Sequence, residues 1–180
     1  MEYYKVDKSK PVKLDLGSGL NLYKGINNDE LEQWIHQDGD KAYHVEIVCD
    51  WRDIPLESGV VDEFHSSDTI EHIPPWDKDV ILKEWNRIMK IGCKVHLATP
   101  NFNFSCIQYA TGKMTLQEAQ QNLYGDRAGF YHVHYETYTV ETLTETLEKY
   151  GFGELDFSES PGFPGTVWWI VVHCKKVRNV

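Results

Sequence analysis

The 180-residue sequence predicts an α/β fold built on a mostly parallel sheet. Two observations support this prediction. Short apolar runs with the character of buried strands flank an amphipathic helix over residues 81–89. The first run, Val12–Leu16, also leads directly into Gly17-Ser18-Gly19. A strand that ends in Gly-x-Gly turns sharply and allows close approach, and open α/β sheets bind ligands at the carboxyl ends of their strands.

Four segments are predicted as strands of the main sheet, because each is a short extended run that ends at a turn or at an acidic residue: Val12–Leu16, Val45–Cys49, Val61–Ser66 and Lys94–Thr99. The helix over residues 81–89 stops at Lys90-Ile91-Gly92 and connects the last two of these strands. Together they form a β-α-β unit, which is right-handed by rule.

The C-terminal half predicts an insertion and then an antiparallel ending. Residues 101–133 are rich in Asn, Gln, Tyr and Gly, and we expect an insertion or lid over the pocket, with one short helix opened by the capping box of Thr115 and Glu118. A final helix is expected over residues 140–150, with Thr139 as its N-cap. Residues 153–157 and 166–173 are expected to pair as antiparallel strands. No repeat or linker interrupts residues 1–180, which favours a single domain.

Composition narrows the class of protein. The net charge is −10 and the sequence pI is about 5.2, with no broad run of basic residues, so nucleic acid is a disfavoured partner. No segment approaches the length of a membrane span and no apolar leader is visible, which favours a cytoplasmic protein without membrane contact. The four cysteines are widely separated and are expected to be buried free thiols. Either a monomer or a homodimer is compatible with this composition.

The glycine turn distinguishes between two classes of cofactor site. A dinucleotide site requires G-x-G-x-x-G, but Leu22 occupies the third glycine position. The segment Asp15-Leu16-Gly17-Ser18-Gly19 is instead a D-x-G-x-G motif. From Asp50 to Pro100, several features of different kinds match one family at the same spacing. These residues resemble the class I S-adenosylmethionine-dependent methyltransferases, and most closely a branch of small methyltransferase type 11-like proteins.

The resemblance implies a Rossmann-like methyltransferase fold, with a mostly parallel seven-stranded sheet, a C-terminal antiparallel hairpin and helices on both faces. It also departs from the family at several positions. Asn21 stands where a third glycine is often found, Ser18 stands where this branch has Cys, and Ile91-Gly92-Cys93 replaces Pro-Gly-Gly after the helix. The resemblance covers residues 12–100 and, more loosely, residues 134–175.

The resemblance also implies a set of residues that bind S-adenosylmethionine. Asp15, Gly17, Ser18 and Gly19 would border its methionine end, and Ser67 and Asp68 would contribute to cofactor binding at the end of the fourth strand. The resemblance places a short second strand before Asp29, which would accept hydrogen bonds from the ribose hydroxyls, with Glu30 as the alternative. Asp50 would accept from the adenine amino group, while Trp51 donates its amide and flanks the purine. The structural alternatives are that Asp15 only orients the turn and that Trp51 only covers a strand end.

The catalytic residues are less directly indicated, because methyl transfer requires mainly alignment and removal of a proton. His72 is the first candidate base, and His134 is the second. His132 and His134 share one face of an extended segment, but the sequence provides no third ligand, so no metal site is predicted. We expect methyl transfer to a small molecule, a glycan or a protein side chain. A catalytically silent S-adenosylmethionine-binding module is the alternative, and a nicotinamide dehydrogenase ranks third.

Overall fold

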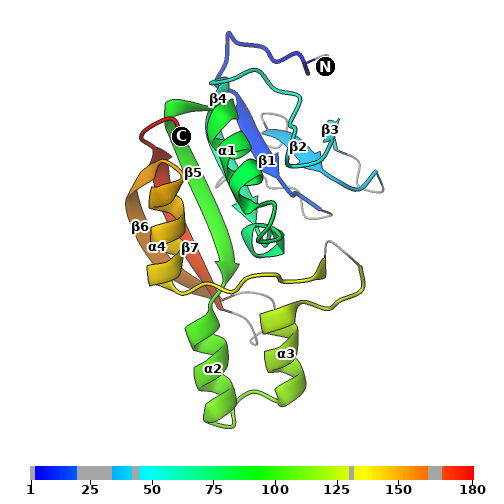
Figure 1. The fold of residues 1–180 in the computed structure, drawn as a ribbon, viewed down its shortest axis with the longest axis vertical. Coiled ribbons are helices and arrows are strands. Elements are labelled where there is room, and N and C mark those ends of the chain that lie inside the picture. Colours follow the sequence, from blue (N-terminus) through cyan, green and yellow to red (C-terminus); the bar gives the residue numbers. More distant parts are fainter. Residues whose placement is uncertain (1–2, 20–33, 42–44, 130–131, 162–167) are drawn as a thin grey trace.

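The computed structural model describes residues 3–19, 34–41, 45–129, 132–161 and 168–180. Within these residues, seven strands form one sheet in the order β3-β2-β1-β4-β5-β7-β6 (Figure 1). The strands are β1 (Lys13–Leu16), β2 (Trp34–Asp38), β3 (Ile47–Val48), β4 (Val61–Ser67), β5 (Met89–Pro100), β6 (Phe152–Pro161) and β7 (Trp168–Lys176). The first five strands are parallel, and β7 runs antiparallel to both β5 and β6. The predicted mostly parallel sheet with an antiparallel ending is confirmed.

The second strand does not lie where the sequence predicted it. It spans Trp34–Asp38 rather than ending before Asp29, and it pairs with β1 so that Asp15 lies opposite His36. Asp29 itself falls outside the described residues. The strand lacks a recognisable apolar pattern because two of its buried positions are polar: His36 is 2% exposed and Gln37 is fully buried. Gln37 donates to the carbonyl oxygen of Cys49 at 2.8 Å, which satisfies its side chain and ties β2 to the segment after β3.

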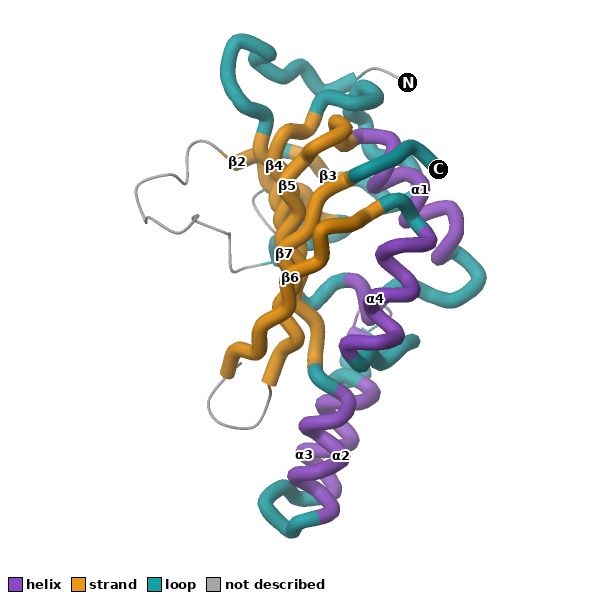
Figure 2. Tube along the Cα trace, turned by 90° about the vertical axis from the view of Figure 1, so that its left-hand side faces the viewer, coloured by secondary structure: helices purple, strands orange, loops and turns teal. Residues whose placement is uncertain are grey.

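Two helices cover one face of the sheet. Helix α1 (Lys78–Ile88) places Trp85 against Phe64 of β4, with ring centroids 5.3 Å apart, and α4 (Val140–Lys149) packs beside β6. Both helices lie on the same side in Figure 2. The sequence predicted helices on both faces of the sheet. In the described part of the chain, helices cover one face. No helix among these residues has the length and apolar character to cross a membrane.

The opposite face carries a row of ionisable side chains. The Asp15 carboxylate accepts from Nδ1 of His65 at 2.7 Å and from Nδ1 of His36 at 3.0 Å. The row continues because His65 lies opposite His96, and His96 lies opposite His173. Neighbouring residues along a strand point to opposite faces, so His65 faces away from the helix layer that Phe64 contacts. We call these five residues the histidine row.

The junction between α1 and β5 is direct, because the helix ends at Ile88 and the strand begins at Met89. The sequence predicted a stop at residues 90–92 and a shorter strand. A buried lysine from the last strand stabilises the junction: Lys176 is 2% exposed, and its Nζ donates to the carbonyl oxygens of Asn86 at 2.7 Å and Met89 at 2.9 Å. A cation at this position also interacts favourably with the negative end of the helix dipole.

The segment after β5 forms two helices, α2 (Phe102–Ala110) and α3 (Leu116–Tyr124), where the sequence predicted one. Asn101 caps the first by accepting from the amide of Phe104, and the predicted capping box of Thr115 and Glu118 opens the second. The two helices pack side by side and extend beyond the sheet (Figure 2). The C-terminal end of α3 points back toward the carboxyl ends of the parallel strands.

Candidate functional site

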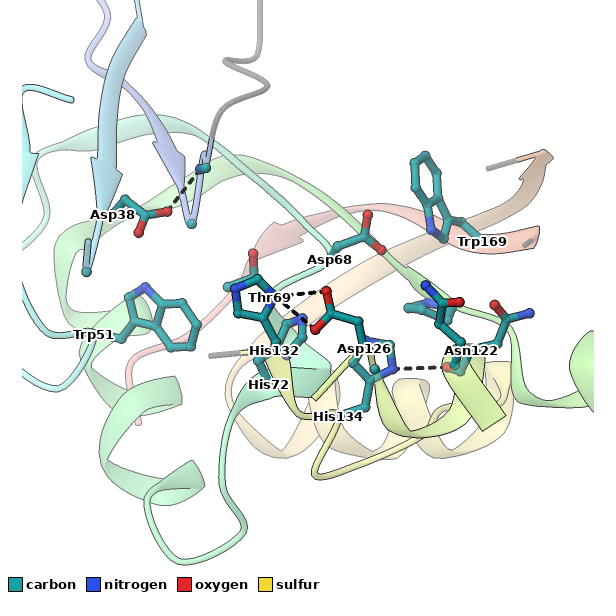
Figure 3. Close-up of a pocket in the computed structure, with 16 residues that line it drawn as sticks. Asp38, Trp51, Asp68, Thr69, His72, Asn122, Asp126, His132, His134 and Trp169 are labelled. Atoms are coloured by element: carbon teal, nitrogen blue, oxygen red, sulfur yellow. Dashed lines mark hydrogen bonds and ion pairs between the residues drawn. The ribbon is translucent and has the colours of Figure 1, made fainter. Parts of the chain in front are cut away.

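A cavity of about 400 Å³ opens at the carboxyl ends of the parallel strands. Figure 3 shows Asp38 and Trp51 on one side of this cavity and Asn122 and Trp169 on the other. The lining residues come from six places: the ends of β1 and β2, the loop after β3, the segment after β4, the end of β5, the region from the end of α3 to residue 134, and the start of β7. They include Gly17, Gly19, Asp38, Gly39, Trp51, Asp68, Thr69, His72, Asn122, Asp126, His132, His134 and Trp169.

The glycine turn after β1 forms one wall, and its conformation explains why glycine is required. Gly17 has φ +69°, and a Cβ atom built on it would lie 2.5 Å from Oγ1 of Thr69. The turn therefore packs against the segment that follows β4. The amides of this turn are hydrogen-bonded to β2. Gly17 and Ser18 donate to the carbonyl oxygen of Gln37 at 2.9 and 3.1 Å.

Asp38 is the acidic residue that ends the second strand. Its Oδ2 accepts from the Gly19 amide at 2.9 Å and its Oδ1 accepts from the Asp40 amide at 2.9 Å, so both oxygens help to fix the turn. The sequence analysis missed this residue because it placed the strand too early. The available signal was Asp38-Gly39 at the end of a short segment that begins with Trp34 and Ile35.

The loop after β3 separates the cavity from a second, smaller hollow of about 100 Å³. Trp51 and Gly39 line both spaces, whereas Asp50, Arg52, Pro74 and Ile81 line only the smaller one. The Asp50 carboxylate accepts from Nε of Arg52 at 2.8 Å and from a terminal guanidinium nitrogen at 2.7 Å. These bonds lower the pKa of Asp50, so its carboxylate is charged at the rim of the hollow.

Two acidic residues follow β4, and they differ in exposure to the cavity. Asp68 lines it in a left-handed conformation with φ +49°, and burial raises the pKa of its carboxyl to about 6. Glu71 is 1% exposed, and burial and the neighbouring charge of Asp68 raise the pKa of Glu71 well above its ordinary value. Its Oε2 accepts from Oγ1 of Thr99 at 3.0 Å. Ser67, which the resemblance also assigned to the cofactor, does not appear among the residues that line the cavity.

The two predicted base candidates lie together. His72 ends the short 3₁₀ turn η2 (Ile70–His72), and His134 belongs to the extended segment before α4. Their ring centroids are 4.7 Å apart and nearly perpendicular. The Tyr135 amide donates to the Glu71 carbonyl oxygen at 2.8 Å, which holds the two segments side by side. The structure thus brings together two residues that are 62 positions apart in the sequence.

Backbone carbonyls determine which ring nitrogen carries the proton in each of these histidines. Nδ1 of His72 donates to the Val133 carbonyl oxygen at 2.9 Å, and Nδ1 of His134 donates to the Asn122 carbonyl oxygen at 3.0 Å. Because a carbonyl only accepts, each neutral ring carries its lone pair on Nε2. Burial lowers the pKa of both rings, that of His72 to about 4, so both are neutral at pH 7.

His132 shares the cavity but not this arrangement. Its side chain is 49% exposed, and its Nδ1 lies 3.1 Å from a carboxylate oxygen of Asp126. The sequence paired His132 with His134 on one face, whereas the structure pairs His134 with His72. Of the remaining predicted residues, Asp15 is buried in the histidine row and does not line the cavity, and the side-chain hydroxyl of Ser18 turns toward the Gln37 carbonyl oxygen at 3.4 Å.

Comparison with known proteins identifies the fold. No protein-family model matches the sequence, and no curated protein sequence matches it. Solved structures do match. A methyltransferase from Thermotoga maritima, described as a possible histamine N-methyltransferase, superposes with a TM-score of 0.65 at 16% identity, covering 93% of this chain and 83% of that one. The chain has the S-adenosylmethionine-dependent methyltransferase fold.

Other structures with the methyltransferase fold match over similar lengths. A methyltransferase from Methanosarcina mazei gives a TM-score of 0.62 at 15% identity and covers 99% of this chain and 100% of that one. The 1,6-didemethyltoxoflavin-N1-methyltransferase of Burkholderia thailandensis gives 0.63 at 16% identity, with 94% and 73% covered. That enzyme was solved with 1,6-didemethyltoxoflavin and S-adenosylhomocysteine bound.

Proposed function

We propose that the chain transfers the methyl group of S-adenosylmethionine to an acceptor bound in the 400 Å³ cavity. One observation carries the proposal: within a methyltransferase fold, the glycine turn, Asp38 and Trp51 converge on a single cavity at the carboxyl ends of the parallel strands. In open α/β sheets this edge is where ligands bind. The fold and the cavity together support S-adenosylmethionine as the cofactor.

Asp38 takes the ribose role in this proposal, replacing the predicted Asp29. It ends the second strand and lines the cavity beside Gly19. A carboxylate can accept about four hydrogen bonds, and the amides of Gly19 and Asp40 use two of these sites on Asp38. The remaining capacity suits two vicinal hydroxyl groups.

The adenine ring occupies the smaller hollow in our proposal. Trp51 lines both spaces, so a ligand that bridges them passes along its side chain. Pro74 and Ile81 offer apolar contacts for the purine, and Asp50 lies at the rim, where a carboxylate can accept from an exocyclic amino group. Arg52 holds Asp50 in position through two hydrogen bonds.

The methionine end and the acceptor meet in the remaining part of the cavity. Asp68 supplies negative charge that suits the positive sulfonium, and Asn122, His134 and Trp169 border the opposite side. The protein has to align the acceptor with the methyl carbon and remove its proton where the acceptor carries one. His72 and His134 carry lone pairs on Nε2, which keeps both as candidates for a group that acts on the acceptor.

The acceptor class follows from charge and size. A net charge of −10 opposes nucleic acid, and a cavity of this volume suits a small molecule or the end of a longer side chain. Beyond Asp38 and Trp51 the cavity extends to Asn122 of α3 and to Trp169. This extension favours a transferase over a catalytically silent cofactor-binding module.

Calorimetric titration with S-adenosylmethionine, S-adenosylhomocysteine and NAD tests the proposal. We expect micromolar affinity for the first two and none for NAD. Asp38→Asn and Asp50→Asn should each weaken cofactor binding by about 1 to 3 kcal/mol, because each leaves a polar partner poorly matched. Asp40→Asn is the matched control, since this neighbouring acid lines neither hollow. Binding of NAD alone, or equal affinity in all three variants, would contradict the assignment.

A further inference from the structure

Three potential metal ligands meet beside the cavity. One ligand atom from each of Glu71, His72 and His134 can be chosen so that all three lie within 4.8 Å of one another. Ligand atoms bound to one zinc ion at ~2.0 to 2.2 Å are roughly 3 to 4 Å apart. Small rotations of the side chains are therefore enough to bring these atoms to bonding distance from a shared ion.

The two histidines are held as metal-binding histidines usually are. Each donates its Nδ1 proton to a backbone carbonyl, His72 to Val133 at 2.9 Å and His134 to Asn122 at 3.0 Å. A ligating imidazole commonly donates its second ring nitrogen to such a group, which fixes its orientation and makes the other nitrogen a better ligand. These hydrogen bonds leave the Nε2 atom of each histidine available to bind a metal ion.

Glu71 supplies an independent observation that points to a missing partner. Its side chain is 1% exposed, and Oε1 is buried with no hydrogen-bond donor among the described residues. The Asp68 carboxyl lies at hydrogen-bonding distance from the Glu71 carboxyl, so two acidic groups share this buried position. No lysine or arginine within the described part of the chain forms an ion pair with Glu71. A buried oxygen without a donor is unfavourable, and a bound cation would satisfy it.

The set of donor atoms selects the class of metal. Two imidazole nitrogens and one carboxylate oxygen suit zinc, iron, manganese or cobalt, whereas magnesium and calcium prefer oxygen ligands alone. Three protein ligands leave coordination positions open, as in catalytic rather than purely structural sites. His72 and His134 both line the cavity, so the open positions face the space where the acceptor is expected.

We propose that Glu71, His72 and His134 bind a divalent transition metal whose open positions take an oxygen atom of the methyl acceptor. The metal site stands on the geometry alone, and its role in catalysis rests on the proposed methyltransferase function. Bound to the metal, an acceptor hydroxyl releases its proton to solvent more readily. Its oxygen then bonds to the methyl carbon, the carbon–sulfur bond breaks with its electrons remaining on sulfur, and neutral S-adenosylhomocysteine leaves.

Metal titration of the whole chain tests the site without any methyl acceptor. The purified protein is treated with EDTA and titrated with Co²⁺, with visible ligand-field absorption as the readout, and Zn²⁺ is added in competition. We expect a tetrahedral or five-coordinate Co²⁺ spectrum that Zn²⁺ removes and Mg²⁺ does not. Glu71→Gln, His72→Ala and His134→Ala should each weaken Co²⁺ affinity at least tenfold.

His132→Ala is the matched control, because His132 lines the same cavity but lies outside the three-residue cluster. Its affinity for Co²⁺ should remain within twofold of the wild type. Glu71→Gln keeps the shape of the side chain, so thermal unfolding separates misfolding from ligand loss. In this variant the metal-free melting temperature should be retained, while the rise on adding Zn²⁺ should disappear.

Two outcomes would overturn the site: no Co²⁺ spectrum in the wild type, or equal loss of affinity in His132→Ala and His134→Ala. The experiment also separates the two proposals. Metal binding without binding of S-adenosylmethionine supports the site and contradicts the methyltransferase function. Cofactor binding without metal binding supports that function and overturns the site.

Discussion

The histidine row makes the stability of the fold sensitive to mild acid, and His96 allows this to be measured. Burial, together with the charges of His65 on β4 and His173 on β7, lowers the pKa of His96 to about 4. Nδ1 of His173 lies 3.3 Å from Nδ1 of His96, and the His65 ring stacks on the other side with centroids 5.0 Å apart. Protonating His96 in the folded protein therefore places a charge between two other imidazoles.

The sign follows from comparing the two states. In the unfolded chain the pKa of a histidine is about 6.5, whereas in the folded protein the pKa of His96 is about 4. Between these two pH values the unfolded state binds a proton at this residue and the folded state does not. Stability is lost as the pH falls through this interval. The full shift corresponds to a loss of about 2 kcal/mol between pH 7 and pH 5. Because His96 is only partly buried, solvent screening reduces the expected loss to about 1 to 2 kcal/mol.

Urea unfolding followed by tryptophan fluorescence at pH 7 and pH 5 measures this effect. His96→Gln removes the titrating group, so the variant should lose about 1 to 2 kcal/mol less than the wild type between the two pH values. His132→Gln, at an exposed position outside the row, should behave as the wild type does. If the His96 variant and the wild type lose the same amount, the reasoning about the row is refuted.

Three further predictions concern other contacts. Lys176→Met should destabilise the protein by about 2 to 3 kcal/mol in urea unfolding, because it strands two buried carbonyl acceptors at the end of α1 and removes the charge that complements the helix dipole. Gly17→Ala should destabilise by about 2 to 4 kcal/mol, since its Cβ would overlap Thr69. Gly19→Ala should destabilise by only about 1 kcal/mol, because Gly19 also has a positive φ but nothing lies within 4 Å of the added Cβ atom. Equal losses of stability in the Gly17 and Gly19 variants, measured by thermal unfolding, would contradict this prediction. Of the four thiols in the native protein, only that of Cys106 should react rapidly with Ellman's reagent at pH 8. Cys106 is exposed, whereas burial raises the pKa of the other three thiols to about 12. Fast reaction of a second thiol would disprove this prediction.

Most of the fold could be predicted from local patterns. The apolar alternation of β1, the amphipathic face of α1 and the caps at Thr115 and Thr139 all involve residues a few positions apart, and all are present in the structure. β2 could not be found this way. Its buried His36 and Gln37 are stabilised by Asp15 and by the backbone after β3, and such partners are invisible to a search for apolar periodicity.

The same limit explains which residues of the candidate site could not be identified from the sequence. Asp38 was missed because its strand was missed, and the role of Asp15 changed because its carboxylate serves two histidines on neighbouring strands. His72 and His134 were each identified as candidates, but only the three-dimensional contact between η2 and the segment before α4 brings them together beside Glu71. The roles of Ser67, Asp68 and Asp50 in binding remain predictions.

The position of β7 has a consequence for how the chain is made. This strand follows β6 in the sequence, yet it lies between β5 and β6, where Lys94 pairs with Lys175 and Phe152 pairs with Lys176. As the polypeptide leaves the ribosome, β5 and β6 therefore emerge before the strand that joins them. Until β7 arrives, the inner edge of β5 is open to other extended chains, and Lys176 is not yet available to close the end of α1. The sheet can therefore be completed during synthesis only when β7, which joins β5 to β6, has emerged.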